Sequence, residues 1–112
     1  MDIKWTDFLE SKVNSFVKWD MVRFFHDNPH ASDTADQIAR YIGRDESLVL
    51  HELQDLIAAD VLEAEEIAGV QVYRLTSDPT TRELVSSFVE ACHDREFRVQ
   101  AIYHVIRGMQ LS

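Results

Sequence analysis

The sequence predicts a mainly α-helical fold with one small β-hairpin. Three observations support this fold class. Apolar residues recur at helical spacing through most of the chain. One stretch, about 61–76, alternates between apolar and polar residues instead and has an Ala-Gly pair near its centre. Two short, capped helices are expected directly before that stretch, which places the hairpin after a helix pair.

Composition limits the class of protein before any motif is considered. The chain has 112 residues, a net charge of −9 and one cysteine. This length predicts one domain, or one domain with an appended helix. No apolar run approaches the roughly 18 residues that span a bilayer, and the first residues lack the apolar core of a signal peptide. The single cysteine excludes an internal disulfide, so we expect a cytoplasmic protein with no membrane segment.

Two helices are expected in the first quarter of the chain. The first covers about 3–13, with Thr6 as a plausible cap. The second covers 15–27, because its apolar residues form one helical stripe. Asn28-Pro29 ends that helix, since proline disfavours helical backbone in the residue before it. A polar connector over 30–33 follows.

The next stretch reads as two short helices separated by a tight break. Thr34 and Gln37 have the spacing of a capping box. Gly43 ends the first helix, because glycine tolerates the left-handed backbone of a helix C-terminus. Asp45 can cap the second helix. This is the helix-turn-helix pattern, with expected helices over 35–42 and 46–59.

The hairpin and the C-terminal helices complete the prediction. Strands are expected over 61–67 and 70–76, joined by a turn at Ala68-Gly69, and a helix begins near Pro79. Apolar periodicity continues to about 108, and we favour a break at His93-Asp94 over one continuous helix. The expected units are residues 1–79, a winged domain with its N-terminal helix, and 80–112, a helical extension.

Helices followed by a hairpin give the order of a winged helix-turn-helix. The segment TADQIARYIG, the cap and core positions from Asp45 to Leu56, and the closing VYRLT resemble transcriptional regulators of the arsenical-repressor and multiple-antibiotic-resistance-repressor kind. The resemblance covers about 15–76. It implies a winged helix-turn-helix fold with additional N- and C-terminal helices. It also implies that helix 46–59 enters the major groove of double-stranded DNA while the hairpin reaches the neighbouring backbone.

Candidate DNA contacts follow from that implied geometry. With about 100° per residue, the outward face of helix 46–59 presents Ser47, Leu48, His51, Gln54 and Asp55. Ser47, His51 and Gln54 can hydrogen-bond base edges. The candidate phosphate contacts are Arg44 and Arg74, to which the flanking helices could add Lys4, Lys12, Lys18 and Arg23.

The charge of this region favours a different kind of partner. Residues 44–75 contain two arginines and eight acidic residues, a net charge of −6, and the rest of the chain carries −3. Glu63, Glu65 and Glu66 stand on the first strand of the hairpin, where the family tends to place basic residues. DNA-binding domains are usually basic. The fold favours a DNA-binding transcriptional regulator that acts as a homodimer, and this is the function we expect. The alternative is an acidic winged-helix interaction module that binds a basic protein and no DNA.

The C-terminal helical region has more apolar residues than one short domain can cover. This surplus predicts a homodimer interface, because a monomer would expose a large apolar patch. The alternative is that the helix packs back on its own domain beside Trp5 and Phe8. The candidate interface residues are Phe88, Val99, Ile102, Tyr103 and Ile106.

No enzymatic or metal-binding pattern emerges from the sequence. There is no nucleophile elbow and no glycine-rich phosphate loop, so no catalytic residue is expected. The five histidines are scattered without close ligand spacing, and we expect neither metal nor cofactor. Cys92 lies on an apolar stripe, which predicts a buried and unreactive thiol.

Overall fold

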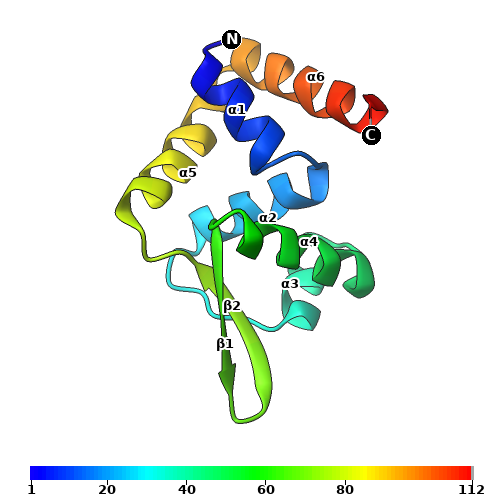
Figure 1. Ribbon diagram of the computed structural model, residues 1–112, viewed down its shortest axis with the longest axis vertical. Helices are drawn as coiled ribbons and strands as arrows, with labels where there is room; N and C mark the ends of the chain where they lie inside the picture. The colour runs from blue at the N-terminus through cyan, green and yellow to red at the C-terminus, as the bar shows by residue number, and fades with distance from the viewer. Residues whose placement is uncertain (112) are drawn as a thin grey trace.

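The computed structural model describes residues 1–111 and confirms the predicted fold class, a winged helix-turn-helix with additional terminal helices. The described residues form six helices and a two-stranded antiparallel sheet. The molecule is elongated, and the hairpin lies at the opposite end from the first and last helices (Figure 1). In chain order the elements are α1 (Ile3–Ser11), α2 (Phe16–Asp27), α3 (Ala35–Ile42), α4 (Glu46–Ala58), β1 (Leu62–Ile67), β2 (Val70–Leu75), α5 (Pro79–Ala91) and α6 (Arg95–Leu111).

The predicted helix-turn-helix is present with its expected caps. The Thr34 hydroxyl accepts from the Gln37 amide at 3.3 Å, and the Gln37 side chain accepts from the Thr34 amide at 3.2 Å. Gly43 ends α3 with a φ of +70°, where other residues are strained. Asp45 caps α4 by accepting from the Ser47 amide at 3.1 Å. Hydrogen bonds from Ser47 and Leu48 hold the pKa of Asp45 below its ordinary value.

The cap of α1 differs from the prediction. Asp2 caps the helix by accepting from the Lys4 amide at 3.0 Å, and the helix ends at Ser11. The predicted cap, Thr6, lies inside the helix, and its hydroxyl donates to the Ile3 carbonyl at 3.0 Å. The prediction was wrong because threonine both caps helices and bonds back to a preceding carbonyl, and sequence pattern does not separate the two.

The hairpin turns at the predicted Ala68-Gly69 pair. Both residues have positive φ, +51° and +80°, as a two-residue hairpin turn requires. Tyr73 and Leu75 point from β2 into the core. Tyr73 also forms an antiparallel bridge with Asp33, through backbone hydrogen bonds of 2.8 and 3.1 Å. The connector before α3, predicted only as a polar link, therefore extends the sheet and fixes the base of the hairpin.

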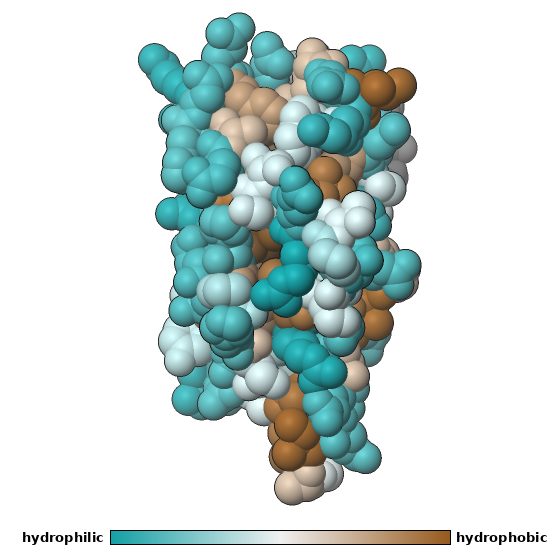
Figure 2. All heavy atoms as spheres, turned by 90° about the vertical axis from the view of Figure 1, so that its left-hand side faces the viewer, coloured by the Kyte–Doolittle hydropathy of each residue, from teal (hydrophilic) through white to brown (hydrophobic). Residues whose placement is uncertain are grey.

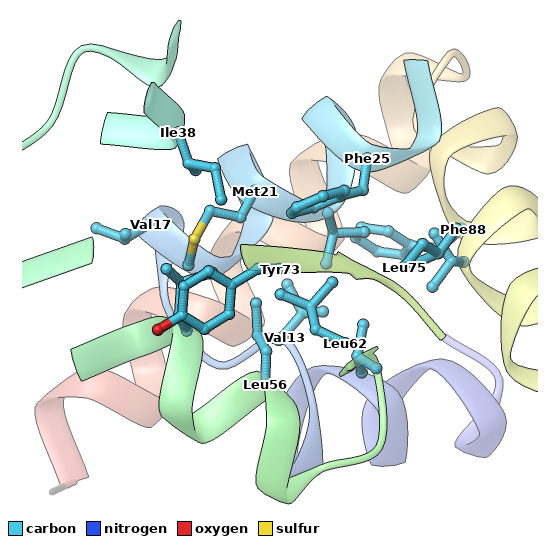
Figure 3. Close-up of a cluster of buried hydrophobic side chains, with 14 of the residues drawn as sticks. Val13, Val17, Met21, Phe25, Ile38, Leu56, Leu62, Tyr73, Leu75 and Phe88 are labelled. Carbon is cyan, nitrogen blue, oxygen red and sulfur yellow. The ribbon is translucent and has the colours of Figure 1, made fainter. Parts of the chain in front are cut away.

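The main core fills the space between α2, α3, α4 and the hairpin. Met21, Phe25, Ile38 and Leu56 have no exposed surface and meet Tyr73 of β2 at its centre (Figure 3). Loss of any of these large side chains would leave a cavity. The core therefore fixes the orientation of α4 relative to the hairpin.

A second, aromatic cluster attaches the terminal helices to this core. The break near His93-Asp94 is confirmed, because α5 ends at Ala91 and the Asp94 carboxylate accepts from the Phe97 amide at 2.9 Å, one turn into α6. Phe88 of α5 lies at the centre of the cluster and is fully buried. The rings in contact with it are Trp5, Phe8, Trp19 and Phe97, at centroid distances of 4.9 to 6.2 Å.

Lys18 joins α2 to α4 through buried ion pairs. Its ammonium lies 3.2 Å from a Glu52 carboxylate oxygen and 3.1 Å from an Asp55 oxygen. Only 6 % of Lys18 and 8 % of Glu52 is exposed. Ser15 also donates to Glu52 at 2.9 Å, and Lys18 donates to Asn14 at 2.6 Å. A buried charge is tolerated only when it is paired in this way.

Removing Lys18 should therefore destabilise the protein. Lys18→Met leaves the buried Glu52 carboxylate without its cation, and we expect the free energy of unfolding to fall by about 2 kcal/mol. Urea denaturation measures this change, and Lys18→Met with Glu52→Gln should recover part of the loss. Arg40→Met, at a side chain that is 79 % exposed, is the control and should change stability by less than about 0.5 kcal/mol. Equal losses in both single variants would contradict the buried ion pair.

Candidate nucleic-acid interface

The exposed side of α4 and the hairpin together form the α4–wing surface, defined as the exposed side chains of residues 44–75. Ser47, His51 and Gln54 are all exposed on α4, as expected. Leu48 and Leu50, 42 % and 40 % exposed, lie among them. The Ser47 hydroxyl donates to the Asp45 carboxylate, so one of the three candidate base-contacting groups is already engaged in the helix cap. The face predicted from helical geometry is therefore open, with a mixed polar and apolar character.

Arg44 is held by a carboxylate of α2. Its Nη2 and Nε atoms lie 2.8 and 3.1 Å from the same Asp20 oxygen. About two fifths of each side chain is exposed, so the pair sits at the surface and adds little to stability. Its importance is electrostatic, because Asp20 cancels the positive charge that was expected to contact phosphate.

Arg74 is neutralised in the same manner on the hairpin. It pairs with Glu65 across the strands and lies 3.5 Å from Glu63. The hydrogen bond from Arg74 to Glu65, with the charges of both glutamates, raises the pKa of Arg74. Glu63 also accepts from the Ser77 amide at 2.7 Å, and this bond holds the pKa of Glu63 below its ordinary value. The cation therefore faces two carboxylates.

Most of the flanking basic residues are buried, engaged with another group or distant from this surface. Lys18 is buried, and Lys12 donates to the Ala59 carbonyl at 2.5 Å. Lys4 lies over the Trp5 ring in α1, at the far end of the molecule from the hairpin. Arg23 is exposed on α2, and Arg40 pairs with Asp36 within α3. Within residues 44–75, both basic side chains have carboxylate partners.

The tip of the hairpin is apolar. Ile67 and Val70, paired across the turn, are 51 % and 49 % exposed. Figure 2 shows apolar atoms gathered at this end of the molecule, with hydrophilic side chains above them. Glu66 pairs with Gln71 directly behind the tip. The hairpin therefore presents an apolar end bordered by negative charge, which sequence analysis did not single out.

The candidate interface residues of the C-terminal region divide into two groups. Val99, Tyr103 and Ile106 are 55 %, 60 % and 42 % exposed on α6, and Ile102 is half-buried. Phe88 is fully buried within the protomer, so the expectation that it meets a second chain is wrong. Its surface is already covered by the aromatic cluster. The opposite face of α6 is buried against the rest of the chain through Ala101 and Val105. Helix α6 therefore packs on its own domain with one face and exposes an apolar stripe on the other.

Other candidate sites contribute no ligand-binding chemistry. Among residues 1–111, no three His, Cys, Asp or Glu side chains are grouped as a metal site would require. Cys92 is half-buried, and its burial raises the pKa of the thiol to about 11, against the smaller opposite effects of Arg98 and Arg23. In the same part of the chain, no helix is long and apolar enough to span a membrane.

The chain matches no protein-family model, no curated protein and no solved structure. The resemblance to winged-helix regulators therefore rests on the quoted sequence segments and the fold. A fold of this kind can present very different surfaces, and fold alone does not determine function. The function must be argued from the charge and shape of the α4–wing surface.

The Cys92 thiol should react slowly in the folded protein. A pKa of about 11 leaves little thiolate at pH 8, and thiolate is the reactive form. We expect alkylation by iodoacetamide to be about a hundredfold slower in the native protein than in the urea-unfolded chain. Mass spectrometry of timed samples measures both rates. Equal rates in the two states would contradict the buried, protonated thiol.

Proposed function

We propose that the protein is a homodimeric winged-helix regulator that docks its α4–wing surface on a basic protein partner. One observation supports this choice above all others. Both arginines of the surface are paired with carboxylates, while the segment that forms it has a net charge of −6. Such a surface attracts a basic partner and repels a polyanion.

The strength of the attraction to DNA phosphates decides between a protein partner and a DNA partner. Winged helices gain most of their non-specific affinity from lysine and arginine placed at phosphates, with about one counterion released per contact. A phosphate that contacts Arg44 or Arg74 would also meet the carboxylate that already neutralises that arginine. Each such contact therefore gives little net attraction. Generic duplex DNA is therefore a poor ligand for this surface.

The apolar tip of the hairpin predicts a second feature of the proposed partner. Ile67 and Val70 offer an apolar contact that a protein groove can bury, and Glu65 and Glu66 lie beside it for basic side chains. Interfaces commonly combine an apolar centre with a polar rim. We therefore expect a partner with an apolar groove bordered by lysine or arginine.

A second candidate function is sequence-specific DNA binding by the homodimer. It is favoured by the winged fold and by His51 and Gln54, which are exposed on α4 and can hydrogen-bond base edges. In a dimer, two α4 helices would read two half-sites. Affinity would then come from base contacts and from the simultaneous binding of two half-sites, and phosphate contacts would contribute little.

A DNA titration at two salt concentrations tests the proposal. Fluorescence anisotropy with labelled random duplex should show no binding below about 10 μM protein at 0.15 M salt, and a shallow salt dependence. Sub-micromolar binding with a steep salt slope would contradict the charge argument and favour the second candidate. Selective binding to a few genomic fragments, with none to random duplex, would also favour DNA reading.

Reversing the wing charges tests the geometry independently. Glu65→Lys with Glu66→Lys adds two cations and removes one of the two carboxylate partners of Arg74, so we expect non-specific DNA binding to appear. The matched control is Glu10→Lys with Glu83→Lys, which makes the same charge change at exposed positions outside the α4–wing surface. If both double variants bind DNA equally, total charge rather than surface placement is responsible. That outcome would contradict the proposal that the carboxylates of the hairpin are what prevents DNA binding.

The homodimer is tested by charging the exposed stripe of α6. Ile102→Glu with Ile106→Glu should convert a dimer to a folded monomer or an unfolded chain, because two carboxylates per chain would be buried in the interface. Sedimentation velocity at high micromolar concentration separates these states, and circular dichroism reports folding. Ile67→Glu with Val70→Glu, at the opposite end of the molecule, is the control and should remain dimeric. A wild-type monomer at these concentrations would overturn the homodimer.

A further inference from the structure

We propose that α6 pairs with α6 of a second copy in antiparallel orientation, about a two-fold axis at Ile102. The inference rests on the proposed homodimer and adds its orientation, register and specific ion pairs. It comes from three features of α6: an apolar stripe, its position at the end of the molecule, and two oppositely charged residues beside the stripe.

The apolar stripe faces away from the protomer. Val99, Tyr103 and Ile106 follow one another at intervals of four and three residues, which places them along one side of a helix. Ala101 and Val105 are buried on the opposite side against the domain. Since α6 lies along one end of the molecule, across from the hairpin, a second copy can approach the stripe without touching the wing (Figure 1). Two α4–wing surfaces would then stay free.

Glu96 and Arg107 identify the second copy as the occupant of the stripe. They are eleven residues apart, so at about 100° per residue they differ by only about 20° around the helix. Both are exposed along the same edge of the stripe. Among residues 1–111 of the protomer, neither has an ion-pair partner. The edge therefore has one acid near its start and one base near its end.

Antiparallel pairing satisfies both charges at once. Two antiparallel helices related by a perpendicular two-fold axis bring their equivalent edges together, so Glu96 of each chain faces Arg107 of the other. The same register sets Val99 against Ile106. The midpoints of the two pairs lie on either side of Ile102, so with the axis at Ile102 the partners in each pair are displaced by only one residue, about 1.5 Å. In a parallel pair, Glu96 and Arg107 of the two chains would lie about 16 Å apart along the axis. Charge and apolar pattern therefore select the same arrangement.

Charge reversal tests the pairing directly. Glu96→Arg sets two arginine pairs against each other in the dimer, and we expect about tenfold weaker association; Arg107→Glu should have a similar effect. The double variant, Glu96→Arg with Arg107→Glu, should restore wild-type association. A mixture of the two single variants should form heterodimers in preference to homodimers. Glu83→Arg, the same change at an exposed position of α5, is the matched control and should have no effect.

The outcomes separate the orientation from the homodimer itself. If the wild type is a dimer and neither Glu96→Arg nor Arg107→Glu weakens its association, the antiparallel pairing is overturned and the homodimer stands. The same conclusion follows if the double variant fails to recover wild-type association. A wild-type monomer would overturn both. Sedimentation velocity over a concentration series measures the dimer dissociation constant of the wild type and of each variant.

Cysteine cross-linking gives a second measurement that does not depend on charge. In a Cys92→Ser background, Val99→Cys and Ile106→Cys mixed together should form a disulfide-linked dimer on mild oxidation, because facing residues lie within the roughly 7 Å between Cα atoms that a disulfide allows. Val99→Cys alone should cross-link poorly, since its two copies are displaced along the axis. Efficient cross-linking of Val99→Cys with itself and none in the mixture would establish a parallel pair and overturn the inference.

Discussion

The ion pairs of Lys18 determine how α4 is held and what α4 can present. The ammonium lies between α2 and α4, almost fully buried, with Glu52 and Asp55 as its partners. Burying this cation is tolerable because two carboxylates surround it. The same contacts bury the Lys18 ammonium, so it is not presented at the surface, and leave Asp55, still half exposed, at the edge of the α4–wing surface. The ion pairs that attach α4 to α2 therefore also withhold a cation from this surface.

The same principle operates at the two remaining cations of the surface. Asp20 holds Arg44, and Glu63 with Glu65 holds Arg74. A winged helix-turn-helix places these positions where a nucleic acid would approach, yet each position presents a neutral pair or a net negative group. The fold supplies the docking geometry, and the side chains decide which partner the geometry accepts. The proposed protein docking by the hairpin and the proposed self-association by α6 would then use opposite ends of the molecule.

Local features of the sequence predicted most of the fold. The Thr34 capping box, the left-handed Gly43 and the break before Asp94 depend on neighbours within four residues, so pattern alone identifies them. Features that depend on contacts between distant segments were missed. The Asp33–Tyr73 bridge and the Asp20–Arg44 pair join residues that sequence spacing cannot relate. Helical geometry placed the outward face of α4 correctly, but whether Arg44 beside it was free depended on the distant contact with Asp20.

The central claim, that the α4–wing surface accepts basic protein and excludes generic DNA, is tested most directly by mapping contacts in solution. Amide chemical shifts of the ¹⁵N-labelled protein would be followed during titration with an arginine-rich peptide bearing apolar residues, and separately with random duplex, at about 0.15 M salt. We expect the peptide to shift amides of α4 and the hairpin, including Gln54 and Ile67, and the duplex to leave them unchanged. Shifts of the same amides by the duplex, with none from the peptide, would contradict the central claim.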